Sequence, residues 1–434
     1  MSSEKGKRSR SSDKGKASQS PEPADPPTLR VAEIVSALSQ ALDFGSGSPP
    51  WHSVRTCILG MRLAAELRLG TEQQNHLYYA LLLKDAGWTV NPAGENRRDI
   101  FAIRCERGGT LARLMRLPEQ TAQSIACISE RWNGQGNAQG LARDQIPIAS
   151  RIILAAQTLD MFAITFGPEP AMRVLVENTG LWFDPTVVKA ARSLEKRGRL
   201  WKGLEEPKLL AQAVSLEPHP TVVSDSDATL DAICQAFATI VDAKSPFTFY
   251  HSNGVANAAV AIARKLGLDN SRVLFVRHAA LLHDIGKMAI PNEILQKSTE
   301  LTRAEWQTVH AHPAHTYRIL NSIRGFGELS EVAASHHERL NGTGYYRGLT
   351  ADQLSIEARI LIVADVFDAL MAKRPYREGM AREVVLQLIR SKTPEQFDPD
   401  CVAALESSGI GGDQSYIDLH TVQAQLGAAA GRRR

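Results

Sequence analysis

Histidines are concentrated in one part of this chain. Eight of its twelve histidines lie between residues 251 and 337. Buried imidazoles need partners for their ring nitrogens, so a helical core rarely collects them without a ligand to hold. His283 and Asp284 follow an apolar run, and Lys287 lies on the same helical face. Imidazoles and carboxylates inside a helical bundle suit Mn, Fe or Zn. The pattern predicts a metal centre beside a phosphate-binding lysine.

The two halves of the chain look like copies of each other. Four blocks match in the same order, at 81–88 and 280–287, 129–141 and 337–349, 149–162 and 357–370, and 182–185 and 396–399. The polar positions differ. The second copy holds His251, His283, Asp284, His336, His337 and Asp365, where the first holds His52, Lys84, Asp85, Ile128, Ser129 and Gln157. We interpret this as an internal duplication whose first copy has lost four of six ligands.

The motifs of the second half resemble the HD-GYP branch of the HD phosphohydrolases. They are HS (251–252), HDIGK (283–287), HAHPAH (310–315), HHERLNGTGYYRGL (336–349) and ADVFDAL…RPYR (364–377). The resemblance covers about 229–405. It implies an all-helical domain with two or three metal ions that hydrolyses the bacterial second messenger cyclic di-GMP. It also implies a set of metal ligands, namely His251, His283, Asp284, His312, His336, His337 and Asp365.

The resemblance assigns roles around these ligands. Asp284 is expected to bridge two ions, and Lys287, Arg374 and Arg377 stand where the family contacts substrate phosphates. Asp284 and Lys287 are therefore the expected catalytic residues. Two ions lower the pKa of a shared water, so that hydroxide attacks the phosphodiester while Lys287 offsets charge on its oxygens. Members with three metals carry a glutamate where this chain has Phe247, so two divalent ions, Fe or Mn, are expected.

The signature loop departs from the family pattern. Asn341-Gly342 stands in place of Asp-Gly, and Gly344-Tyr345-Tyr346 in place of Gly-Tyr-Pro. The lost proline relaxes the backbone, and the lost aspartate removes a charge near the metals. Neither change touches a ligand, so hydrolysis is expected while the nucleotide stays open. Tyr345 is a candidate for stacking on a substrate base, or for packing under its own loop.

Other readings apply to single residues. His312 competes with His310 and His315 for its ligand role, and His278 lies off the face of His283. Lys287 could be a solvated lysine at a helix end. Arg374 and Arg377 could instead cap a helix and pair with Glu378. In the first copy, His52 and Asp85 are interpreted as relics that hold no metal.

Helical periodicity dominates from residue 29 onward and predicts an all-α protein of two tandem helical bundles. Five segments are expected, namely a basic, Ser- and Pro-rich disordered tail at 1–28, a degenerate domain at 29–205, a linker at 206–228, a catalytic domain at 229–410 and a weakly structured tail at 411–434. We expect the degenerate domain to pack against the catalytic one and modulate it. A homodimer or a signalling protein is a further expected partner.

Composition excludes several classes of protein. The chain has 434 residues, of which 43% are hydrophobic and 22% charged, as in soluble globular proteins. Its net charge of +3 comes from basic tails, so no nucleic-acid partner is predicted. No run approaches the roughly 18 apolar residues of a membrane span, and no secretory signal is present. Five scattered cysteines indicate a reducing compartment, and a cytoplasmic protein is expected.

Three functions agree with these observations. The first is a metal-dependent phosphodiesterase acting on a cyclic dinucleotide, for which cyclic di-GMP is the expected substrate. The second keeps this chemistry and changes the substrate to another nucleotide. The third is a receptor that binds metal and nucleotide, turns over little, and signals through the first half.

Overall fold

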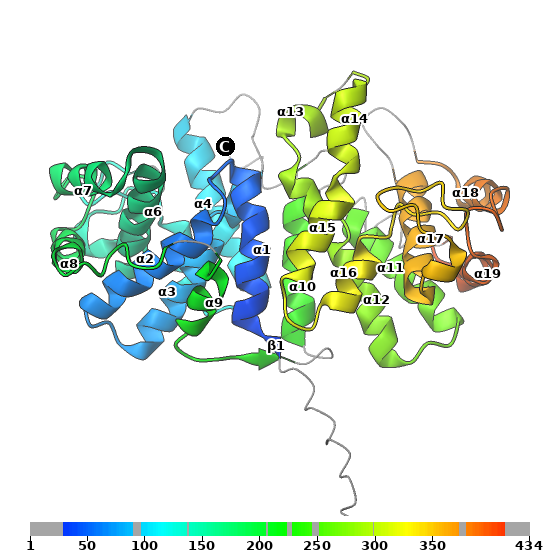
Figure 1. Ribbon diagram of the computed structural model, residues 1–434, viewed down its shortest axis with the longest axis horizontal. Coiled ribbons are helices and arrows are strands. Elements are labelled where there is room, and N and C mark those ends of the chain that lie inside the picture. Colours follow the sequence, from blue (N-terminus) through cyan, green and yellow to red (C-terminus); the bar gives the residue numbers. More distant parts are fainter. Residues whose placement is uncertain are drawn as a thin grey trace, which may run out of the picture.

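Helices account for nearly every element of the chain that the structure describes (Figure 1). The structure is a computed structural model, and it describes residues 29–89, 97–136, 139–204, 207–223, 228–244, 251–297, 299–372 and 379–412. The one sheet in these ranges is an antiparallel pair of β1 (Leu29–Arg30) and β2 (Val222–Val223). The predicted all-α class is confirmed.

The helices fall into two sets. The first set comprises α1 (Val31–Ser46), α2 (His52–Glu66), α3 (Thr71–Leu83), η1 (Ala86–Thr89), α4 (Arg97–Leu114), α5 (Glu119–Ala126), η2 (Arg143–Gln145), α6 (Ile148–Phe166), α7 (Pro168–Glu177), α8 (Pro185–Lys196) and α9 (Leu209–Ser215). The second set comprises α10 (Ala228–Asp242), α11 (His251–Lys265), α12 (Asn270–Leu282), η3 (Ile285–Ala289), α13 (Asn292–Leu295), α14 (Arg303–His310), α15 (His312–Asn321), α16 (Gly327–Ala333), η4 (Ala351–Gln353), α17 (Ile356–Met371), α18 (Arg382–Arg390) and α19 (Pro399–Ser408).

The second set repeats the first in order. Elements α10, α11, α12 and η3 start about 200 residues after α1, α2, α3 and η1, and α17 starts 208 residues after α6. The long helix α4 corresponds to the pair α14 and α15. In each set the central helix α2 or α11 packs on α3 or α12 and on α6 or α17. The internal duplication is therefore visible in the architecture as well as in the motifs.

Local sequence explains where the site-bearing helices begin. The Asp269 carboxylate accepts hydrogen bonds from the backbone N–H of Ser271 and Arg272, which caps α12. The Ser355 hydroxyl accepts from the Ala358 N–H and starts α17. Such caps satisfy backbone donors that a helix leaves unpaired at its first turn.

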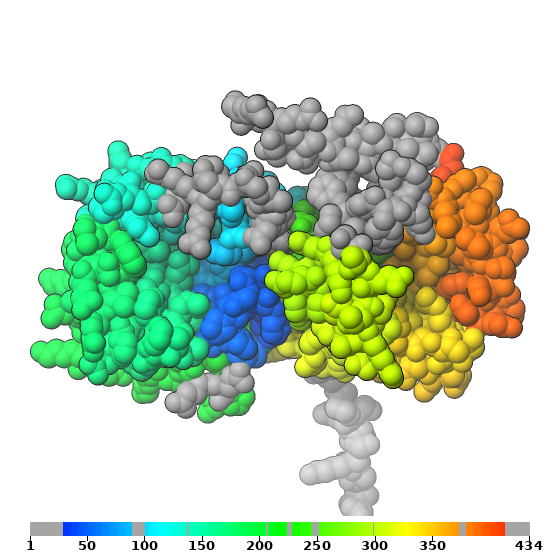
Figure 2. All heavy atoms as spheres, turned by 90° about the horizontal axis from the view of Figure 1, so that it is seen from above, coloured from blue at the N-terminus to red at the C-terminus, as the bar shows by residue number. Residues whose placement is uncertain are grey.

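Helices α1 of the first set and α10 of the second lie at the centre of the molecule, where the two sets meet (Figure 1). Both are buried around most of their circumference, the pattern of a helix packed on two sides. Helix α1 contacts η3 and α15 of the second half, and α10 contacts η1 and α4 of the first half. Seen from above, α1 lies beside the second half (Figure 2). The halves thus share one apolar core.

The range expected to be a linker, 206–228, contains ordered elements. Helix α9 packs against α1 and α2, and β2 pairs with β1 at the start of α1. Arg30 on β1 donates to the buried Glu217 carboxylate. This segment ties both ends of the first half together, although the Pro, Ser and Asp content of 217–227 predicted a linker.

Among the described helices, α6 has the length and apolar composition that a membrane crossing would require. It occupies the position that α17 has in the second half. It packs on α2 and α7 and buries Ser150 and Asp160. These contacts are those of a core helix.

Candidate metal centre

All seven predicted ligands converge on one point of the second half. They come from five segments: His251 begins α11, His283 and Asp284 join α12 to η3, His312 begins α15, His336 and His337 follow α16, and Asp365 lies inside α17. All are buried except His337, which is partly exposed. Three overlapping triads have ligand atoms within 4.8 Å of one another, namely His251–His283–Asp365, His283–Asp284–His336 and His312–His336–His337.

Three of the imidazoles are oriented by their own helices. The Nδ1 atoms of His283, His312 and His336 lie 2.7 Å from the carbonyls of Ala280, Val309 and Ala333, each three residues earlier. A carbonyl only accepts, so Nδ1 carries the proton and Nε2 presents a lone pair to the centre. The Nε2 atoms of His312 and His336 lie 3.0 Å apart. Two converging lone pairs need a cation between them, as in a metal site with ordered outer contacts.

Asp284 faces both sides of this centre. Its Oδ2 lies 3.3 Å from His283 Nε2, while its Oδ1 lies 3.3 Å from His312 Nε2 and 3.6 Å from His336 Nε2. Oδ1 and His283 Nε2 are buried without a hydrogen-bond partner. Buried polar atoms of this kind call for a bound ion or water as their partner. The geometry fits a carboxylate shared by two ions, which supports the bridging role proposed for Asp284.

Asp368 orients His251, and the sequence analysis did not single it out. Its Oδ2 lies 2.7 Å from His251 Nδ1, and His251 Nε2 lies 3.1 Å from Asp365 Oδ1. A carboxylate behind a ligating histidine fixes the ring and strengthens it as a ligand. The signal was present, because Asp368 and Asp365 are three residues apart on one helix face.

Gly254 makes room for this carboxylate. A Cβ at this position would lie 1.7 Å from Asp368 Oδ1 and 2.5 Å from its Cγ. We expect Gly254→Ala to push Asp368 away from His251 and to weaken metal binding about 10- to 100-fold, the usual effect of losing such an outer contact.

The check for Gly254→Ala is metal affinity by competition with a chelator, with circular dichroism confirming the fold. Asp368→Asn should weaken binding similarly, because it removes the same charge behind His251. Undiminished metal affinity in both variants would show that Asp368 does not orient a ligand.

Electrostatics prepare the centre for a cation. Burial, and then neighbouring imidazoles, hold the pKa of His336 and of His337 well below the usual value, so both are neutral ligands. Burial also lowers the pKa of His251, but the carboxylates of Asp365 and Asp368 outweigh it and raise that pKa to about 10. A metal must displace this proton, so binding is favoured at higher pH.

Two lysines frame the turn η3. Lys287 pairs with the Asp284 carboxylate and stays partly exposed at the edge of the centre. Lys244, buried after α10, donates to the carbonyls of Met288 at 2.5 Å and Ile290 at 2.7 Å. Burial lowers the pKa of Lys244 to about 8. The first copy has Gly45 at the matching position. These two hydrogen bonds from a lysine to the backbone of η3 are therefore specific to the ligand-bearing copy.

The signature loop folds back on a buried glutamate. The Glu338 carboxylate accepts from the backbone N–H of Arg347 at 2.8 Å and of Leu349 at 2.9 Å. A Cβ on Gly344 would lie 2.4 Å from the Glu338 Cα, which requires glycine there. The Asn341 side-chain oxygen accepts from the N–H and hydroxyl of Thr343. Asn341 thus supports the turn as an aspartate would, without its charge.

The other predicted positions have different outcomes. Tyr345 packs against His337 with ring centroids 4.6 Å apart, at the mouth of the centre. His278 faces Asp231, away from the ligands. Arg374, Arg377, Glu378 and Phe247 lie outside the described residues. His310 and His315 belong to none of the three ligand triads.

The first copy replaces the missing cations with its own side chains. Lys84 stands where the second copy has His283, and its buried ammonium pairs with Asp85. Arg55 stands at the position of Gly254 and donates to both oxygens of Asp160, at 2.6 and 3.0 Å. Asp160 corresponds to Asp368. The remaining carboxylates are thus neutralised within the protein, which supports the interpretation of the first copy as metal-free.

In each copy a buried aspartate fixes the start of the helix whose first residue is the leading histidine, His52 in α2 and His251 in α11. The Asp43 carboxylate accepts from the N–H and hydroxyl of Ser53, next to His52, and Asp242 accepts likewise from Ser252. Burial raises the pKa of both carboxyl groups to about 7, and nearby Lys84 only partly offsets it for Asp43.

This burial predicts a pH-dependent stability. The folded-state pKa of Asp43 lies above its ordinary value of 3.8, so the folded protein binds the extra proton between these values. The free energy of unfolding therefore rises as pH falls through this window. Asp43→Asn keeps an acceptor for Ser53 without the charge, and we expect it to stabilise the protein at pH 8 by on the order of 2 kcal/mol, with little change at pH 5.

Urea denaturation of wild type and Asp43→Asn at both pH values measures this difference. Asp43→Ala, which removes the acceptor as well, should destabilise at both. An equal effect of Asp43→Asn at pH 5 and pH 8 would contradict titration of this carboxyl group.

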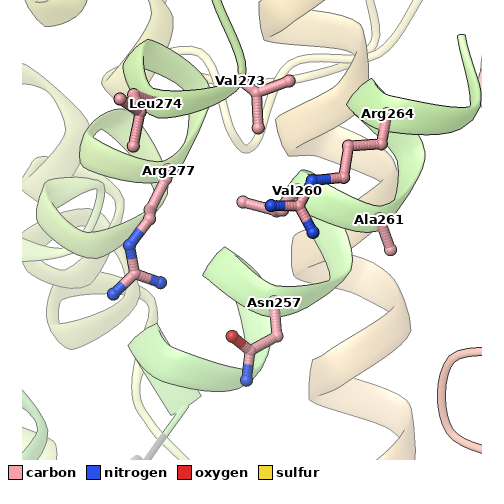
Figure 3. Close-up of a pocket in the computed structure, with 7 residues that line it drawn as sticks. All are labelled: Asn257, Val260, Ala261, Arg264, Val273, Leu274 and Arg277. Atoms are coloured by element: carbon pink, nitrogen blue, oxygen red, sulfur yellow. The ribbon is translucent and has the colours of Figure 1, made fainter. Parts of the chain in front are cut away.

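A separate pocket of 480 Å³ lies between α11 and α12. Asn257, Val260 and Arg264 of α11 face Val273 and Arg277 of α12 across it (Figure 3). Arg277 is paired with Asp231 on α10. The pocket lining offers neither an imidazole nor a carboxylate ligand, and it lies toward the opposite ends of both helices from His251 and His283. It is not part of the metal centre.

Known proteins resemble both halves of this chain. The family model described as "HD domain" matches residues 46–187 and 235–401. A 3′3′-cGAMP-specific phosphodiesterase 3 of Vibrio cholerae is 34% identical, across 88% of this chain and 95% of that protein. The cyclic di-GMP phosphodiesterase response regulator RpfG of Xanthomonas campestris is 39% identical, across 35% of this chain and 40% of its own.

A solved structure agrees in fold. The crystal structure of a cyclic GMP-AMP-specific phosphodiesterase of V. cholerae (V-cGAP3) superposes with a TM-score of 0.66 at 34% identity, covering 88% of this chain and 98% of that one. The family match therefore includes both copies, and the second copy brings together the ligand positions. The chain belongs to the HD-domain family of metal-dependent phosphohydrolases, in its HD-GYP branch, as a tandem of a degenerate and a ligand-bearing copy.

Proposed function

We propose that this protein is a metal-dependent phosphodiesterase that hydrolyses a 3′3′-linked cyclic dinucleotide, with cyclic GMP-AMP as its preferred substrate. The observation that carries the proposal is the convergence of seven ligands, among which Asp284 presents its two carboxylate oxygens to different imidazoles. Phosphodiester hydrolysis by two metals needs such a shared carboxylate with an open approach for the phosphate.

The residues of the chain have distinct roles in this proposal. The two ions, Fe or Mn, supply hydroxide at neutral pH and stabilise negative charge on the phosphate when bound. The seven ligands hold them, and Asp368 orients His251. Lys287, now paired with Asp284, is the cation placed to contact a non-bridging phosphate oxygen. Arg374 and Arg377 are proposed as further phosphate contacts.

The choice of cyclic GMP-AMP rests on the extent of similarity. The relative that spans both halves of this chain is named for 3′3′-cGAMP. Relatives named for cyclic di-GMP, such as RpfG and PA4108 of Pseudomonas aeruginosa, match 35% and 45% of this chain. The Asn341 and Tyr346 substitutions in the signature loop also separate this chain from the pattern on which cyclic di-GMP was predicted. Cyclic di-GMP remains the second candidate substrate.

The test is hydrolysis of cyclic GMP-AMP, cyclic di-GMP and cyclic di-AMP by the full chain, purified anaerobically with Mn or Fe(II). We expect fastest turnover of cyclic GMP-AMP. Faster turnover of cyclic di-GMP would contradict cyclic GMP-AMP as the preferred substrate but would still support phosphodiester hydrolysis. Bound metal with no turnover of any of the three would favour the receptor.

A further inference from the structure

A row of aromatic rings leads from the metal centre to the surface of the second half. Tyr345 lies 4.6 Å from the ring of His337, and His310 stacks on Tyr345 with centroids 4.1 Å apart and planes at 18°. Trp306 follows at 5.3 Å from His310, one turn earlier on α14. We call Tyr345, His310 and Trp306 the aromatic row. It joins a predicted ligand to solvent through one stacked and two tilted ring contacts.

The outer end of the row is exposed. The Trp306 side chain keeps 48% of its surface accessible, and His310 is also exposed. Large aromatic rings ordinarily bury most of their area, so an exposed indole beside a site is suited to contact a ligand. Helix α14 begins with a Thr302–Glu305 capping box, and Lys297 pairs with Glu305 at 2.7 Å. The indole is therefore carried by a capped helix.

The first copy shows that the fold does not require this row. Gly87 and Gly286 each approach a backbone carbonyl, of Arg104 and His312, so that a Cβ would lie 2.0 Å from it. Arg104 therefore aligns with His312, and on this alignment Arg98 and Ala102 correspond to Trp306 and His310. The matched signature loops align Asn137 with Tyr345. The sequence of the first copy thus has no aromatic residue at these three positions.

We propose that the aromatic row is a stacking surface for a purine base of the substrate, with Trp306 as its outer, specificity-determining residue. The proposal rests on the proposed function, because a cyclic dinucleotide with its phosphate at the metal centre extends a base beyond it. Stacking on aromatic rings accepts any base face and contributes about 1–3 kcal/mol per base. The row strengthens substrate binding without taking part in bond cleavage.

The test compares wild type with Trp306→Ala on two substrates. For the cyclic dinucleotide we expect KM to rise about 5- to 150-fold, the equivalent of one base stack, with kcat little changed and Trp306→Phe close to wild type. For methyl p-nitrophenyl phosphate, a phosphodiester without a purine, no change is expected. Trp182→Ala, at an indole of similar exposure in the first half, is the matched control.

Three results would overturn the stacking surface: an unchanged KM for the cyclic dinucleotide, an equal loss on both substrates, or an equal loss in Trp182→Ala. If wild type hydrolyses no cyclic dinucleotide, its affinity is measured by calorimetry. Weaker binding by Trp306→Ala would then support the row while the proposed hydrolysis fails. Equal or absent binding would overturn the row as well.

Discussion

Replacing Asp284 with alanine is expected to abolish phosphodiester hydrolysis and to leave the helices intact. One oxygen of this side chain faces His283 and the other faces His312 and His336. In the proposed mechanism two bound ions would lose the carboxylate they share and would no longer activate a common water. Burial raises the pKa of Asp284, but His283 and Lys287 outweigh it and hold that pKa well below its usual value, so losing the carboxylate should also lower the stability of the metal-free protein.

Three measurements check Asp284→Ala together: turnover, metal content per chain, and thermal unfolding with chelator present. We expect no product, fewer bound ions, and a helical protein whose melting temperature in chelator lies somewhat below that of wild type, because Lys287 loses its partner. Lys287→Ala serves as the companion variant, because it removes the phosphate contact and should lower turnover with metal content unchanged. Undiminished turnover by Asp284→Ala with metal bound would reject the bridging assignment.

The corresponding change in the first copy, Asp85→Ala, is expected to have a different signature. Asp85 is the ion-pair partner of Lys84, whose side chain has no solvent exposure. Removing one member of a buried pair leaves the other charge without compensation, which lowers the free energy of unfolding by about 3–5 kcal/mol. The metal ligands of the second copy are untouched, so metal content of the folded protein should be unchanged.

Urea denaturation followed by circular dichroism measures this loss. The matched control is the double variant Lys84→Met with Asp85→Asn, which removes both charges and keeps similar volumes. Its stability should be close to that of wild type, because a buried pair and a neutral pair often differ little. A destabilisation below about 1 kcal/mol for Asp85→Ala would mean that Lys84 is solvated or paired elsewhere.

Motif spacing was sufficient to predict the helical class, the duplication and the set of residues that converges at the centre. Each ligand sits at the end of a helix or on an inward face, and local sequence determines these positions through caps and apolar periodicity. His312 could be separated from His310 and His315 only by structure. The corner between α14 and α15 turns its imidazole inward and leaves the other two outside the ligand triads.

Residues that act through long-range contacts were not predictable in the same way. Lys244 meets the carbonyls of Met288 and Ile290 across 44 and 46 residues, and no local pattern encodes that encounter. Gly254 is informative only once Asp368 is placed beside it. The segment 206–228 was predicted as a linker from the Pro, Ser and Asp content of 217–227, whereas α9 just before it is a short helix that packs on α1 and α2.

The packing of α1 against η3 has a thermodynamic consequence. The turn that carries Lys287 and follows Asp284 forms part of the surface on which the first half rests. If a bound ion tightens this turn, the free energy gained is shared with the contact between the halves, and the sharing is reciprocal. Detaching α1 would then lower the affinity for the ion by the same factor by which losing the ion loosens α1. The degenerate copy would then act on the metal centre as a permanently attached partner of the catalytic copy.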